Sequence, residues 1–139
     1  MTIEQKYLPP EILNKSTISG KEYGWDRQDF QNVIEAATEI GLGIIGGQVQ
    51  FKLPDGTCEL YWRKYDTAER VKDEKWTEYR ERTKQECLSL FNQLPINKEL
   101  VNEGIENFDF LKDKFSEGIN LEKYLIFIIY FNDKETENE

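Results

Sequence analysis

Apolar side chains recur at helical spacing in two long segments of the chain. In the first segment they follow the i, i+3, i+4, i+7 spacing that buries one face of a helix. Asp26 is suited to cap the N-terminus of such a helix, and Gly41 is suited to end it in the left-handed conformation. The pattern therefore predicts a helix over residues 26–40. Its apolar face consists of Phe30, Val33, Ile34, Ala37 and Ile40.

The second periodic segment predicts the longest helix, over residues 74–94. Its outer face alternates acidic and basic side chains, as solvated helix faces do, and Pro95 stops it. Residues 98–117 predict one or two further short helices, with Gly104 as the expected break. The apolar positions of the long helix are Trp76, Tyr79, Thr83, Cys87, Leu90, Phe91 and Leu94.

Two segments follow strand patterns instead. Residues 43–65 predict a β-hairpin around the turn Pro54-Asp55-Gly56. The turn chemistry favours a three-residue loop that pairs Phe51 with Glu59. The apolar pattern instead matches Val49, Phe51 and Leu53 with Cys58, Leu60 and Trp62, which needs a four-residue loop. We favour the second register, because a slip of one residue would expose a whole face.

The second strand pattern spans residues 121–131, where the run Leu125–Ile129 is apolar on both faces and indicates a central strand. We therefore expect an α+β fold with a small, mainly antiparallel sheet packed against the three helical segments. Residues 1–132 are expected to form a single domain, beginning with an irregular lead-in over residues 1–24. The acidic segment 133–139 is expected to be a disordered tail.

The chain is strongly acidic, with a net charge of −9 over its 139 residues. The acid is concentrated near the C-terminal end: residues 98–123 carry seven acidic and four basic side chains. A nucleic-acid binder usually presents a basic stripe, and an anionic membrane would repel this surface, so we expect neither partner. A basic protein would be steered toward it.

Candidate catalytic chemistry is sparse. The chain has no histidine, which removes Ser-His and Cys-His activation and the commonest metal ligand. Cys58 and Cys87 are too few for a disulfide scaffold or a zinc site, and each falls on a predicted apolar face. The glycine cluster 41–47 stands before a strand, whereas a phosphate cradle precedes a helix. Glu59, near Tyr61, is the most suggestive acid for catalysis.

We therefore expect no enzyme activity, cofactor or metal, and a cytoplasmic protein with reduced thiols, because the start of the chain has no apolar signal segment. Trp62 and Trp76 are expected in the core. Two surfaces are candidates for contact with a partner: the polar face of the hairpin and the acidic C-terminal third. The hairpin residues are Gln48, Gln50, Lys52, Glu59, Tyr61, Arg63 and Tyr65, and the acidic ones are Glu99, Glu103, Glu106, Asp109 and Asp113.

Four short motifs resemble a family of bacterial immunity proteins. They are Tyr23-Gly-Trp-Asp-Arg-Gln-Asp-Phe, Val33-Ile-Glu, Ile44-Ile-Gly-Gly-Gln-Val and Trp76-Thr-Glu-Tyr-Arg-Glu-Arg, and they cover about residues 23–94. Two positions depart from the family pattern. The family has Gly-Gly-Asp-Val where this chain has Gln48 after the double glycine, and it has a serine after the Trp-x-x-Tyr-x-x-Arg segment where this chain has Thr83. Members of this family protect cells against toxins of polymorphic or contact-dependent systems, so the resemblance implies a binder of a cognate toxin domain.

Three functions follow as hypotheses. The first is an immunity protein, a monomer or weak homodimer, that neutralises a toxin by stoichiometric binding; a basic nuclease would suit its charge. The second is a small-molecule or carbohydrate-acting enzyme that uses a carboxylate pair in a deep pocket. The third is an adaptor module that forms a homodimer through the edge of the hairpin.

Overall fold

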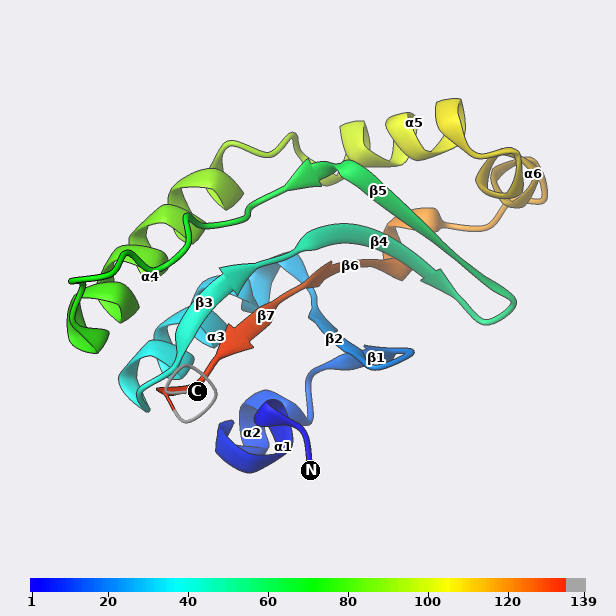
Figure 1. The fold of residues 1–139 in the computed structure, drawn as a ribbon. Coiled ribbons are helices and arrows are strands. Elements are labelled where there is room, and N and C mark those ends of the chain that lie inside the picture. Colours follow the sequence, from blue (N-terminus) through cyan, green and yellow to red (C-terminus); the bar gives the residue numbers. More distant parts are fainter. Residues whose placement is uncertain (135–139) are drawn as a thin grey trace.

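The computed structural model describes residues 1–134 and has the expected α+β architecture, with a five-stranded antiparallel sheet and a smaller two-stranded one (Figure 1). The strand order of the large sheet is β1-β2-β6-β4-β5, and β3 pairs with β7 in the small sheet. The strands are β1 (Thr17–Ser19), β2 (Glu22–Trp25), β3 (Gly43–Gly46), β4 (Gln48–Leu53), β5 (Gly56–Lys64), β6 (Leu125–Ile128) and β7 (Tyr130–Asn132).

The predicted helices are present with small shifts at their ends. The helix predicted over 26–40 is α3 (Arg27–Glu39), and the one predicted over 74–94 is α4 (Trp76–Asn92). The third segment forms α5 (Asn97–Asn107) and α6 (Asp109–Ser116), and the break falls at the extended Phe108. Gly104 lies inside α5, where a Cβ would come within 2.9 Å of both Leu111 and Phe51. The glycine therefore serves close packing and does not end a helix.

The prediction of an irregular lead-in over residues 1–24 was wrong. This segment forms α1 (Ile3–Tyr7), α2 (Pro10–Leu13) and the hairpin β1–β2. A capping box at Thr2 starts α1, and Pro10 stands at the first position of α2, where its missing N–H costs nothing. Trp25 holds the segment by donating from its indole Nε1 to the Ile12 carbonyl at 2.9 Å. Helices this short carry too few turns for a periodic pattern to reveal them.

Both hairpin registers weighed from the sequence were wrong, although the burial argument selected the correct face. Leu53 pairs with Gly56, so the loop has two residues, and Phe51 pairs with Cys58. A salt bridge of 2.5 Å between Lys114 and Asp55 ties this tight loop to α6. At the other end the register shifts, so that Gln48 pairs with Lys64 while the next residue, Val49, pairs with Leu60. Three residues of β5, 61–63, therefore bulge without partners on β4.

The two long predicted strands each split between the sheets. The first breaks between β3 and β4 at Gly47, where a Cβ would lie 1.8 Å from the Ile128 carbonyl oxygen, so only glycine fits there. The second begins as a 3₁₀ turn (Leu121–Tyr124) and divides into β6 and β7. The expected central position holds for β6, which lies between β2 and β4.

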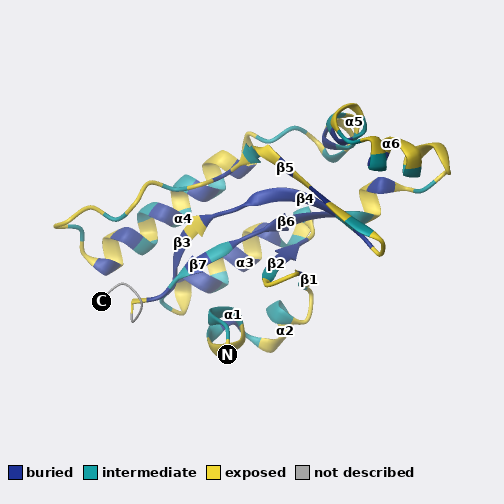
Figure 2. Ribbon diagram, turned by 45° about the vertical axis from the view of Figure 1, so that its right-hand side comes forward, coloured by how far each residue is buried: buried dark blue, intermediate teal, exposed yellow. Residues whose placement is uncertain are grey.

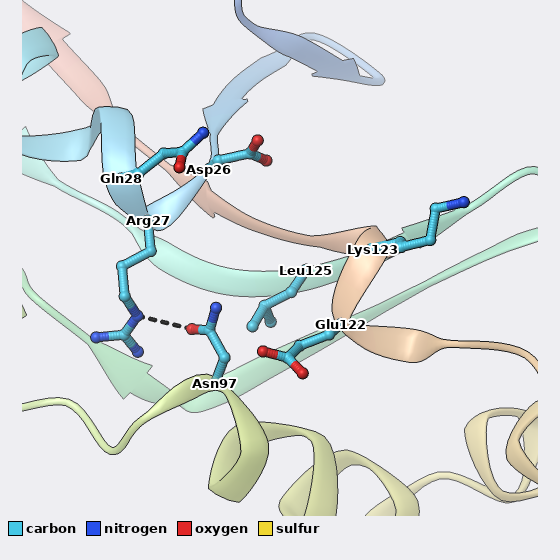
Figure 3. Close-up of a pocket in the computed structure, with 7 residues that line it drawn as sticks. All are labelled: Asp26, Arg27, Gln28, Asn97, Glu122, Lys123 and Leu125. Carbon is cyan, nitrogen blue, oxygen red and sulfur yellow. Dashed lines mark hydrogen bonds between the residues drawn. The ribbon is translucent and has the colours of Figure 1, made fainter.

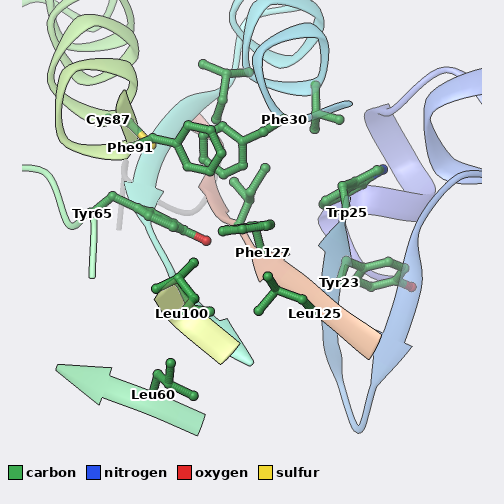
Figure 4. Packing of buried hydrophobic residues seen from close by; sticks show 14 of the residues in the cluster. Tyr23, Trp25, Phe30, Leu60, Tyr65, Cys87, Phe91, Leu100, Leu125 and Phe127 are labelled. Carbon is green, nitrogen blue, oxygen red and sulfur yellow. The ribbon is translucent and has the colours of Figure 1, made fainter. Parts of the chain in front are cut away.

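One hydrophobic cluster joins the helices to one face of the sheet (Figure 4). The rings of Phe30 and Phe91 stack with centroids 3.6 Å apart, and Phe127 meets them edge-on. The single Tyr65 hydroxyl proton is shared within this cluster between two carbonyl oxygens, that of Ile128 at 2.5 Å and that of Gln48 at 3.1 Å. These bonds satisfy polar groups at the place where both long strands change sheets.

Both cysteines and the first residue of the predicted tail are buried. Cys58 and Cys87 are buried free thiols, and burial raises the pKa of Cys87 to about 12. Asp133, the first residue of the predicted tail, is buried. Residues 135–139 lie outside the described part of the chain. Within residues 1–134, no helix combines the length and apolar character needed to cross a bilayer.

We predict that Tyr65→Phe lowers the free energy of unfolding by about 1–3 kcal/mol, because the substitution removes a buried hydroxyl that is hydrogen-bonded to two backbone carbonyl oxygens. Urea denaturation of the two proteins measures this difference. Tyr124→Phe is the matched control: Tyr124 is half-buried, and its hydroxyl has no hydrogen-bond partner within residues 1–134. Equal losses in the two variants would contradict the bridging role of Tyr65.

Candidate protein-binding surface

The hairpin residues predicted to face a partner are divided by the structure. Gln48, Gln50 and Tyr65 are buried, so the expectation that they face solvent or a partner was wrong. Lys52 and Arg63 are half-buried, and Glu59 and Tyr61 are exposed. The bulge at 61–63 changes the alternation of side chains along β5 and turns Tyr65 into the core.

The β1–β2 hairpin accounts for the burial of Gln50. In the sheet, β1 is separated from β4 by two strands, yet the Ser19 Oγ donates to the Gln50 Oε1 at 2.9 Å. Strands neighbour each other at about 4.8 Å, so this contact requires the hairpin to curl over the sheet. Its tip therefore lies against the Gln50 side of β4, where Ser19 and Glu22 bond the Gln50 side chain. All residues of β4 and β6 are buried except the half-buried Lys52 (Figure 2).

A continuous polar network lies beneath this tip. It consists of Ser19, Glu22, Gln48, Gln50, Glu59 and Tyr130. Gln50 donates to Glu22 at 2.9 Å, and Gln48 donates to Glu59 at 3.1 Å. The Tyr130 hydroxyl accepts from Gln48 at 3.0 Å and donates to Glu22. Burial, followed by the bond to Glu22, raises the pKa of Tyr130 to about 12. The network pairs buried polar groups that would otherwise destabilise the fold.

The bulge of β5 displays Tyr61 and Trp62 at the surface, beside the half-buried Phe108 from the break between α5 and α6. We call these three residues the aromatic ledge. Tyr61 is 63% exposed and Trp62 is 36% exposed. Their rings are perpendicular, with centroids 5.1 Å apart, and Trp62 stacks on Phe108 at 6.1 Å. The expectation that Trp62 belongs to the core was therefore wrong. Trp76 is buried as expected and donates to the Gly41 carbonyl.

Glu103 of α5 fixes the ledge. Its carboxylate accepts from the Trp62 Nε1 at 2.8 Å and from the Arg63 guanidinium at 2.9 Å and 2.6 Å. The two bonds from Arg63 have the bidentate geometry that gives such pairs their specificity, and they hold the pKa of Glu103 below its usual value. Arg63 and Glu103 were predicted on two separate surfaces, and the structure brings them into contact.

The remaining predicted acids are exposed on the two helices beside the ledge. Glu99 and Glu106 lie on α5, and Asp109 and Asp113 lie on α6. None of these four forms a salt bridge within the described part of the chain. This acidic surface, defined by these four residues, therefore retains its negative charge for a partner.

A groove of about 400 Å³ lies between the start of α3, the start of α5 and the 3₁₀ turn (Figure 3). Arg27 donates there to the Asn97 side chain at 2.7 Å and to the Pro95 carbonyl at 2.5 Å. Its guanidinium also lies 5.1 Å from the centre of the Phe127 ring, and burial lowers its pKa. These contacts give Arg27 a structural role, which is to join α3 to the connection between α4 and α5.

The described residues hold no group of three or more potential metal ligands of the His, Cys, Asp and Glu types. Comparisons with protein-family models, with curated proteins and with solved structures found no match to this chain. The resemblance to immunity proteins therefore stays a hypothesis. Two of its motif positions have structural partners: Thr83 accepts a hydrogen bond from the Ile44 amide at 3.0 Å, and Gln48 belongs to the polar network.

We predict that Glu103→Ala frees the Trp62 indole and raises its quenching by acrylamide, because the bond from Trp62 and the two bonds from the adjacent Arg63 disappear. Trp62 dominates quenching because Trp25 and Trp76 are 0% and 8% exposed. Glu106→Ala, which removes an exposed charge from the same helix, is the control and should leave quenching unchanged. In the unmodified protein, quenching should stay constant as the pH falls to 4.5, the ordinary pKa of a glutamate, and rise only at lower pH, because Arg63 holds the pKa of Glu103 below that value and protonation then breaks the pair.

A second prediction concerns Tyr130 at alkaline pH. Its pKa is raised from 10 to about 12 in the folded protein, so the unfolded chain loses this proton first. The stability that Tyr130 contributes is therefore complete below pH 10 and declines as the pH rises toward 12. Urea denaturation at pH 8 and 11 should show a smaller loss of stability for Tyr130→Phe than for the unmodified protein. Parallel losses in the two proteins would refute this assignment.

Proposed function

We propose that this protein is an immunity protein that binds a cognate toxin domain and neutralises it stoichiometrically. The observation that carries the proposal is the aromatic ledge, in which the exposed Tyr61 packs against Trp62 and Glu103 holds the Trp62 indole. Binding energy at protein interfaces is concentrated in a few Tyr, Trp and Arg side chains, and rigid ones lose little entropy when they are buried. The resemblance to immunity proteins supports a toxin as the partner.

The polar network and the bulge also support a protein-binding function, because they affect how rigid the strands are and how the edge of the sheet can bind. The network joins strands of both sheets, and a side chain on a supported strand holds its position better than one on a loop. The bulge interrupts the pairing edge of β5, which makes addition of another strand less favourable. Contact through side chains is therefore the mode of binding that this edge supports best.

The acidic surface would act on the rate of association. Glu99, Glu106, Asp109 and Asp113 lie beside the ledge on exposed helix positions. Such rim charges mainly accelerate encounter, whereas desolvated anchors mainly slow dissociation. A toxin with a basic active cleft, such as a nuclease, is the partner that this charge favours.

The proposal predicts that a neighbouring gene encodes a toxin domain, and that domain is the partner for the test. We predict that Tyr61→Ala weakens the complex by about 30-fold, mostly through faster dissociation, as for an anchor worth about 2 kcal/mol. Val71→Ala is the matched control, because Val71 is also an apolar side chain and is 64% exposed, but lies in the loop that precedes α4. Surface plasmon resonance measures both rates. Failure of the unmodified protein to bind or inhibit the toxin would refute the proposal.

The charge argument makes a separate prediction. The combined change of Glu99 and Glu106 to glutamine should slow association and reduce its dependence on ionic strength, while dissociation stays the same. The same instrument at low and high salt measures this. An association rate that ignores ionic strength in the unmodified protein would remove the steering role and leave the anchor role intact.

A further inference from the structure

The two exposed rings of the aromatic ledge meet edge to face, and we call the solvent-exposed angle between them the corner. Tyr61 and Trp62 meet at 90°, with centroids 5.1 Å apart, and Trp62 rests on Phe108. Elsewhere in residues 1–134, cationic side chains occupy the faces of several rings, including those of Phe91, Phe127, Trp76, Tyr79 and Phe110. No cation of the described chain lies over Tyr61 or Trp62. The corner is therefore accessible to a cation from outside.

Negative charge surrounds this corner. Glu59 precedes Tyr61 by two residues on β5, and Glu103 accepts from the Trp62 indole. Glu99 is close enough to Arg63 to contribute to the raised pKa of that guanidinium. Two basic side chains follow the rings in sequence: Arg63, which is engaged by Glu103, and Lys64, which is exposed. Glu59 and Glu99 form no salt bridge within residues 1–134, so the described chain does not neutralise them.

From this combination we infer that the corner between Tyr61 and Trp62 receives an arginine or lysine side chain of the bound partner. The inference rests on the proposed function and specifies the chemistry of its anchor. A ring attracts a cation to its face through its quadrupole, and neighbouring carboxylates add Coulomb attraction. An acidic side chain would be repelled by the carboxylates, and an apolar one could pack on the rings but would gain nothing from the quadrupole or the carboxylates.

The chemistry distinguishes two substitutions at one exposed position. Tyr61→Phe keeps the ring and its quadrupole, whereas Tyr61→Leu keeps apolar area and loses the quadrupole. Both variants should fold, because Tyr61 is 63% exposed and its hydroxyl has no hydrogen-bond partner within residues 1–134. Removal of a cation–ring contact at an exposed site corresponds to a loss of about two- to fivefold in affinity.

The first experiment needs no toxin and uses N-acetyl-arginine amide as the probe. In a ¹H–¹⁵N spectrum the three tryptophans give three indole signals, and only Trp62 is exposed enough to report contact with the probe. The Trp62 signal should shift in a saturable manner with the arginine probe, and not with N-acetyl-norleucine amide at the same concentrations. Tyr61→Phe should retain the response, and Tyr61→Leu should weaken it by about two- to fivefold. Equal shifts with both probes, or none, would overturn the inference.

The second experiment uses the toxin domain and separates this inference from the proposed function. If the corner holds a cation, Tyr61→Phe binds the toxin like the unmodified protein, and Tyr61→Leu binds about two- to fivefold more weakly. Equal affinity of the Phe and Leu variants would overturn the cation inference and leave the immunity function standing. If the unmodified protein does not bind the toxin, the proposed function fails, and the arginine probe alone decides the chemistry of the corner.

Discussion

The surface of this protein depends on the position of the Tyr65 side chain inside it. Its hydroxyl joins the carbonyl groups of Gln48 and Ile128, which mark the points where two long strands change sheets. Its ring packs edge-on against Phe30 and Phe91. Because β5 must deliver this residue to the core while Leu60 remains paired with Val49, the chain between them cannot follow the ladder. The excess length becomes the bulge at 61–63, and the bulge displays the aromatic ledge.

The main helices, the central strand and the buried face of the hairpin were all predictable, because each repeats an apolar pattern over several turns or pairs. The burial of Tyr65 and the exposure of Trp62 were not predictable in this way. Strict alternation from Leu60 places Trp62 inside and Tyr65 outside, and a bulge of three residues reverses both assignments. No local pattern shows the bulge, since its cause is the packing of Tyr65 against helices distant in sequence.

The polar side chains of β4 were misjudged for a related reason. Gln48 and Gln50 alternate with apolar residues, which predicts a solvated face. That face is instead covered by a hairpin from a segment where no structure was expected, and Tyr130 arrives from the far end of the chain. A buried amide is tolerated only when each of its groups is paired, and the partners come from β1, β2, β5 and β7. The members of such a network are distant in the sequence, so they can be identified only from the tertiary structure.

The contact between Arg63 and Glu103 connects two surfaces that the sequence predicted as separate. One was a polar strand face and the other an acidic helical region, and the two residues lie 40 positions apart in the sequence. Their pairing uses one acid to hold the ledge and leaves its neighbours Glu99 and Glu106 exposed. An acidic surface alone attracts any basic macromolecule, so it gives speed without selectivity. Selectivity requires groups that are held in one geometry. Glu103 provides such a geometry, because it holds the Trp62 ring, against which Tyr61 packs, close to the remaining acidic side chains.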